Sequence, residues 1–101
     1  MQTSVVVCGY KRSPFTFANK GALAKTRPDD MAAAVLQSLM TETGVKVDDI
    51  EDILMGCAFP EAEQGFNLAK IVAQLMALPP TIAGTTVNRF LHGSTAAMNC
   101  K

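Results

Sequence analysis

The sequence lacks both a long apolar run and an excess of charge of either sign. Its longest apolar runs are only a few residues, whereas about 20 residues are needed to cross a bilayer. Nine Lys and Arg residues are balanced by nine Asp and Glu residues, which removes the electrostatic basis for binding nucleic acid or an anionic membrane. The start "MQTSVVVCGYKR" has three valines ahead of its basic pair and indicates a strand, not a signal peptide. We therefore expect a cytoplasmic protein with neither a nucleic-acid nor a membrane partner.

The usual residues of metal, disulfide and phosphate sites are also scarce. There is one histidine, and the cysteines Cys8, Cys57 and Cys100 are widely spaced with no C-x-x-C pair, so neither a zinc site nor a disulfide framework is indicated. Neither of the two glycine-rich phosphate-loop patterns occurs. Cys8 and Cys57 have apolar neighbours, and we expect both to be small buried hydrophobic residues. The sequence predicts no metal ligands.

The chain does contain enough apolar material for one domain over residues 1–101, because 49% of its residues are hydrophobic. The stretch "SVVVCGY" is rich in β-branched residues and predicts a first strand, which a loop with Pro, Asn and Gly follows. In "RPDDMAAAVLQSLMTETG", a proline and two aspartates mark the start of a helix, and a glycine marks its end. Met31, Val35 and Leu39 recur every four residues, so we expect one broad helix face to be buried.

The second half of the chain repeats this alternation of strand and helix. A second strand is predicted around Ile53 to Cys57, and a third in "TIAGTTVNRF". Between them, "GFNLAKIVAQLMALPP" has the spacing of an amphipathic helix that two prolines end; the residues of its apolar face are Leu68, Ile71, Val72, Leu75 and Met76. The predicted order is β-α-β-α-β, which indicates an α/β fold with a parallel sheet covered by helices, followed by the start of another helix.

Residues 91–95 occupy the place where such folds bind ligands, outside the carboxyl end of a strand. His92 and Ser94 are a base and a hydroxyl, but two positions apart their side chains diverge, and no third residue orients the imidazole. Ser94 and Thr95 suit a helix cap better than a nucleophile. Arg89 is a lone arginine at a strand end, so both an acidic partner and simple solvation stay open.

Three stretches of the chain resemble the thiolase family, of the degradative 3-ketoacyl-CoA thiolase or acetyl-CoA acetyltransferase type. They are "SPFTFANKGALAKTRPDDMAAAVL", "GVKVDDIEDILMGCAFPEAEQGFNLAKIVAQLMALP" and "GTTVNRF", and they follow the family's order and spacing from about Val5 to Phe90. The resemblance implies the start of a three-layer α/β/α domain with sheet order 3-2-4-5-1, of which this chain contains three strands. It also implies a coenzyme A thioester as substrate, fatty acid metabolism as the setting, and no covalently bound cofactor.

The resemblance also places a nucleophile in the turn after the third strand. In the family "NRF" is followed by a cysteine and then Gly-Ser-Ser, and the helix end lowers the pKa of that thiol. Counted forward from Phe90 the cysteine position falls at Leu91, and counted back from Gly93 it falls at His92. Neither is a thiol, and Cys100 lies about 13 Å further along a helix. The catalytic set is therefore not intact, and the nearest substrate-binding candidates are Asn88, His92, Gly93 and Ser94.

Three functional hypotheses follow from these residues. In the first, the chain belongs to a thiolase-type acyltransferase and is inactive by itself. In the second it is a non-catalytic binding or scaffold chain, which pairs with itself or with a longer thiolase-like partner through exposed sheet edges. In the third it is a truncated gene product, since the resemblance stops where the cysteine is due.

Overall fold

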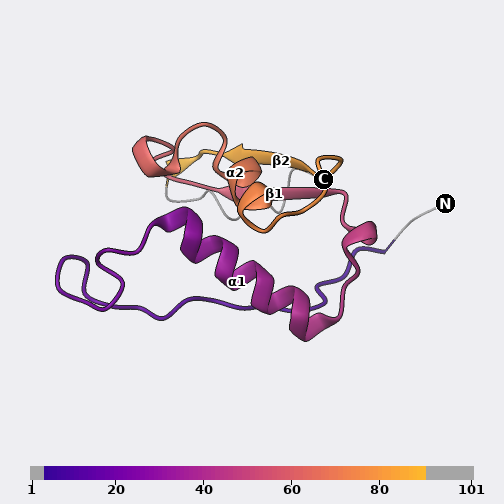
Figure 1. Cartoon of the computed structure of the whole chain (residues 1–101), viewed down its shortest axis with the longest axis horizontal. Coiled ribbons are helices and arrows are strands. Elements are labelled where there is room, and N and C mark those ends of the chain that lie inside the picture. Colours follow the sequence, from indigo (N-terminus) through magenta and orange to yellow (C-terminus); the bar gives the residue numbers. More distant parts are fainter. Residues whose placement is uncertain (1–3, 91–101) are drawn as a thin grey trace.

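The computed structural model describes residues 4–90. Within these residues, two helices, two strands and two short 3-10 turns follow one another (Figure 1). Their bounds are α1 Pro28–Thr43, η1 Val47–Asp49, β1 Asp52–Gly56, η2 Ala62–Gln64, α2 Leu68–Leu75 and β2 Ala83–Val87. Among the described residues, none of the helices has the length and apolar character to cross a membrane.

Helix α1 begins and ends where its sequence signals predict. Pro28 occupies the first turn with Asp29 and Asp30 behind it, and these carboxylates favour the positive end of the helix dipole. Gly44 closes the helix in the left-handed conformation at φ 69°, and its amide donates to the Met40 carbonyl. The broad face that was predicted to be buried is only partly so: Met31, Val35 and Leu39 are half-buried, and the one buried residue of α1 is Asp29.

Strands β1 and β2 form a two-stranded parallel sheet, as the sequence predicts for its second and third strands. The register runs from Asp52 opposite Ala83 to Gly56 opposite Val87. Helix α2 connects the two strands and packs on them, and it gives the molecule most of its core (Figure 1). The buried hydrophobic residues are Cys57, Leu68, Ala69, Val72, Ala73 and Ile82. Leu75, which the helical pattern assigns to the apolar face, is 49% exposed on the last turn of α2.

Helix α2 lies unusually close to β2 because Gly84 has no side chain. A Cβ atom at this position would lie 2.6 Å from the Lys70 nitrogen and 2.8 Å from its Cα, both of them backbone atoms. The Lys70 side chain then reaches past the strand end, where its ammonium donates to the Ile82 carbonyl at 2.7 Å. The backbone of α2 at Lys70 therefore lies directly against the backbone of β2 at Gly84.

The first predicted strand does not form. Residues 4–17 have no helix or strand and belong to an extended segment, here called the N-terminal arm (residues 4–27), which runs along α1 (Figure 1). Val5, Val6 and Val7 are 96%, 72% and 78% exposed, and Cys8 is exposed as well. The prediction of a buried Cys8 was therefore wrong, whereas that of a buried Cys57 is confirmed. The physical reason is pairing, because a strand needs a neighbour for its backbone groups and the described sheet consists of β1 and β2.

Candidate functional site

The carboxyl ends of the two strands lie side by side and define the candidate site. The amide of Cys57, just past β1, donates to the carbonyl of Val87 at the end of β2 at 2.9 Å. Residues 57–67, here called the β1 loop, lead from that point to the start of α2. Three backbone segments thus meet at one edge of the sheet, in the position where α/β folds bind their ligands.

The residues that follow β2 begin a sharp turn. Asn88 is exposed, and its side-chain oxygen accepts a hydrogen bond from the amide of Phe90 at 2.9 Å. Phe90 itself has φ 51°, a left-handed conformation that is uncommon for residues other than glycine. Arg89 is exposed and makes no ion pair with another described residue. The other predicted site positions, which are Leu91, His92, Gly93 and Ser94, lie outside the described residues together with Thr95 and Cys100.

A small hydrogen-bond network fixes the start of α2 against β2. Asn67 donates through its amide nitrogen to the Gly84 carbonyl at 2.7 Å, and its side-chain oxygen accepts from the Thr86 hydroxyl at 2.8 Å. The Thr86 hydroxyl in turn accepts from the free helix amide of Ala69 at 3.1 Å. Thr86 therefore caps α2 from the neighbouring strand. Neither residue was predicted from the sequence, although an asparagine directly before an apolar helical pattern is a usual sign of a helix start.

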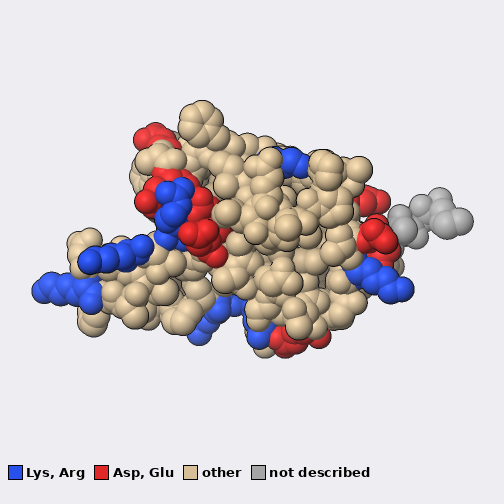
Figure 2. Space-filling model, in the orientation of Figure 1, with Lys and Arg blue, Asp and Glu red and all other residues tan. Residues whose placement is uncertain are grey.

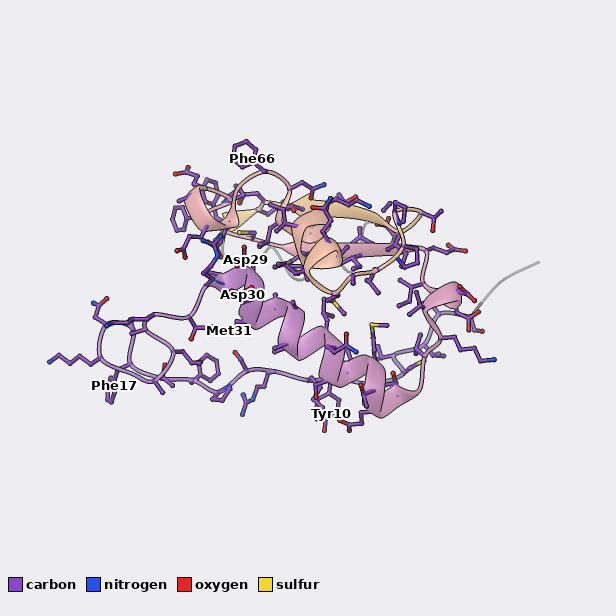
Figure 3. The ribbon with its side chains drawn as sticks, viewed as in Figure 1. Tyr10, Phe17, Asp29, Asp30, Met31 and Phe66 are labelled. Atoms are coloured by element: carbon purple, nitrogen blue, oxygen red, sulfur yellow. The ribbon has the colours of Figure 1, made fainter. Side chains whose placement is uncertain are left out.

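A second polar cluster links the β1 loop to α1, and it too was missed. Arg27 holds both carboxylate oxygens of Asp29, with its Nε at 3.1 Å and its Nη2 at 3.0 Å. Its Nη1 lies 3.8 Å from a carboxylate oxygen of Glu63 in η2. Figure 2 shows positive and negative side chains meeting at this end of the molecule, and Figure 3 places Asp29 at the start of α1.

The buried carboxylate of this cluster is electrostatically compensated. The Asp29 side chain is 6% exposed, which would ordinarily disfavour its charge. The hydrogen bond from Arg27 outweighs that desolvation and holds the pKa of Asp29 below its ordinary value of 3.8. The same hydrogen bond raises the pKa of Arg27. Asp29 also accepts a hydrogen bond from the amide of Asp30 at 2.8 Å, so both of its carboxylate oxygens have hydrogen-bond donors.

Of the two cysteines within residues 4–90, Cys57 is the one at the site, but its surroundings are those of a core residue. It is 6% exposed and packs with Leu68 and Val72. An apolar, enclosed cysteine of this kind is inert compared with one that faces solvent at a helix start. Within residues 4–90, no group of three or more His, Cys, Asp or Glu side chains is arranged to hold a metal ion.

Comparison with known proteins decides which family this arrangement belongs to. The family model described as "Thiolase, N-terminal domain" matches residues 5–100. The chain belongs to the thiolase family. It is 42% identical over 90 residues to the 3-ketoacyl-CoA thiolase of Bacillus subtilis (strain 168), a match that covers 89% of this chain and 23% of that protein. It is 38% identical over 97 residues to the 3-ketoacyl-CoA thiolase of Aliivibrio fischeri, covering 95% of this chain and 25% of that protein.

The fold leads to the same family. The crystal structure of the Bacillus anthracis acetyl-CoA acetyltransferase superposes with a TM-score of 0.69 and 27% sequence identity, over 82% of this chain and 22% of that one. This thiolase chain therefore spans about a quarter of the length of the relatives it matches. The α1-β1-α2-β2 arrangement is an incomplete α/β domain of the thiolase type.

Proposed function

We propose that this chain forms the N-terminal part of a thiolase-type acyltransferase that acts on 3-ketoacyl-CoA and acetyl-CoA. The observation that carries the proposal is the junction of the two strand ends, where Cys57 is hydrogen-bonded to Val87 and the backbone turns at Asn88 to Phe90. The relatives named 3-ketoacyl-CoA thiolase support this substrate class. The coenzyme A thioester is then a substrate, no cofactor is bound covalently, and the setting is fatty acid metabolism in the cytoplasm.

By itself the chain is proposed to be inactive. Acyl transfer needs a nucleophile, a base that removes its proton and donors for the developing oxyanion. Where the resemblance places the nucleophilic cysteine, the sequence has Leu91 or His92. Asn88, His92, Gly93 and Ser94 remain the candidates for substrate contacts around that turn.

The direct test is acetyl transfer to the purified chain. We expect no thiolysis of acetoacetyl-CoA and no stable label after incubation with radiolabelled acetyl-CoA. Stoichiometric acetylation of any residue between 88 and 95 would contradict the inactive state. Two variants, Leu91→Cys and His92→Cys, determine where the nucleophile position falls: the correct one gains a thioester label that hydroxylamine removes, while the other labels no faster than exposed Cys8.

The second candidate is a non-catalytic role, in which the chain pairs with itself or with a longer thiolase-like partner. Exposure of Val5 to Val7 favours it, because an extended segment of β-branched residues whose backbone has no described partner readily pairs with another chain. Sedimentation of the purified chain over a range of concentrations tests self-pairing, and co-elution with a longer thiolase tests the other partner. A truncated gene product predicts neither, and a Cys-Gly-Ser-Ser reading in another frame just past the codon for Phe90 would support it.

A further inference from the structure

The β1 loop contains more backbone strain than any other described part of the chain. Ala62, Phe66 and Asn67 have φ angles of 51°, 56° and 60°, and none of them is a glycine, for which such angles cost nothing. Residues held in this conformation persist only where the surrounding structure fixes them. Phe66 is 96% exposed and points away from the molecule in Figure 3, so its own packing does not fix the loop.

Both ends of the loop are fastened to β2. At its start the Cys57 amide donates to Val87, and at its end the Asn67 side chain bonds Gly84 and Thr86. These bonds leave the middle of the loop, which includes η2, to be held from elsewhere. Its internal bonds, such as that from the Gln64 side chain to the Phe59 carbonyl at 3.0 Å, shape the loop but do not attach it to the body.

The attachment of the middle comes from α1. Arg27 is anchored by two parallel hydrogen bonds to Asp29, a geometry that fixes the plane of its guanidinium. The third nitrogen of the same group then faces Glu63 at 3.8 Å. Asp29 is buried at the first turn of α1 and cannot follow the loop outward. The guanidinium is thus held in place by Asp29 on one side, and on the other side its positive charge attracts the Glu63 carboxylate.

We propose that Arg27 is a positioning residue that fixes the β1 loop over the carboxyl end of the sheet, acting through Glu63. The inference rests on the proposed function only in naming what the loop borders, which is the thiolase-type acyl site. The ion-pair geometry by itself predicts that releasing Glu63 lets the loop lift while both strands stay paired. Cys57, buried where the loop begins, would then become accessible without unfolding of the domain.

The test measures thiol labelling of the whole chain under native conditions, with peptide mass spectrometry to separate Cys57 from Cys8 and Cys100. We expect Glu63→Gln to raise the Cys57 labelling rate about two- to fivefold, the effect of losing one half-exposed ion pair, and to speed amide exchange in residues 58–66. The urea midpoint should stay unchanged, because Glu63 is half exposed. Arg27→Lys keeps the charge but loses the fork that holds Asp29, so it should give part of the increase.

A matched control is present at the other end of α1, where Lys11 forms an ion pair with Glu42. Lys11→Met also removes one ion pair and should leave Cys57 labelling unchanged. An equal rate of Cys57 labelling in Glu63→Gln and in the unsubstituted chain would overturn the proposal. So would labelling that rises in every variant, the control included, in proportion to lost global stability. No step requires acyl transfer, so the inference stands or falls separately from the proposed activity, and Glu63→Gln remains informative if an Arg27 variant fails to fold.

Discussion

Val72 in α2 and Val6 in the N-terminal arm are the same residue, but the first is 0% exposed and the second 72% exposed. Each belongs to a strongly apolar stretch of sequence. The difference lies in the backbone around them: β1 and β2 pair with each other and α2 bonds within itself, whereas none of the described backbone hydrogen bonds involves residues 4–16. Apolar residues are buried only where the backbone that carries them has partners.

The largest effect should come from filling the close contact of α2 with β2. Gly84→Ala places a methyl group 2.6 Å from a backbone nitrogen of Lys70, so helix and strand must separate. We expect a loss of about 3 kcal/mol in the free energy of unfolding, measured by urea denaturation. Gly9→Ala in the N-terminal arm is the control: its Cβ would meet only the side chains of Thr43 and Leu39. A similar loss of unfolding free energy in both variants would mean that the N-terminal arm packs on α1 as tightly as α2 packs on β2.

The comparison of valines can be tested directly by truncation. Val72→Ala leaves a cavity in the core, and we expect it to lower the free energy of unfolding by about 2 to 3 kcal/mol. Val6→Ala removes the same atoms from an exposed segment and should change stability by less than about 0.5 kcal/mol. Chemical denaturation of both variants checks this pair. A cost at position 6 approaching that at position 72 would show that the first strand is paired in solution.

The cap that Thr86 provides should contribute less. Thr86→Val removes the hydroxyl between Asn67 and Ala69 and leaves a helix amide without its acceptor. We expect a loss of about 1 to 2 kcal/mol, with faster exchange of the Ala69 amide as the specific sign. Thr85→Val, on the same strand but exposed, should be neutral. If the two variants lose equal stability, the strand substitution itself and not the cap is responsible.

The smallest expected effect is the dependence of stability on pH through the Asp29 carboxylate. Because the pKa of Asp29 is below 3.8 in the folded chain, its contribution to stability is complete above that value and disappears as the pH falls through the lower, folded-state pKa. Asp29→Asn should therefore be less stable than the starting chain at neutral pH, and the difference should shrink below pH 3.8. Urea midpoints measured between pH 2 and pH 6 give the comparison. A difference that stays constant with pH would show that Arg27 does not stabilise the charged carboxylate.

Local signals predicted the elements that satisfy their own hydrogen bonds or have a neighbour close in sequence. Helix α1 and the pairing of β1 with β2 are confirmed. The prediction of the first strand was wrong, because a pattern of β-branched residues indicates a strand but does not supply a neighbouring strand to pair with it. The prediction that Cys8 is buried was wrong for the same reason. The site positions predicted at Leu91, His92, Gly93 and Ser94 stay predictions, because they lie outside the described residues.

The sequence by itself determined the family and the start and end of α1, because caps and breakers are properties of neighbouring residues. Its periodicity also predicted a helix between the two strands, but α2 ends at Leu75, before the prolines that were expected to end it. Only the tertiary structure decided that Arg27 reaches Glu63, and that Thr86 on a strand caps a helix. These contacts join residues 17 or more positions apart, and no local pattern encodes such distances. The cap by Thr86 depends on how closely α2 approaches β2, and that approach depends on the missing side chain of Gly84.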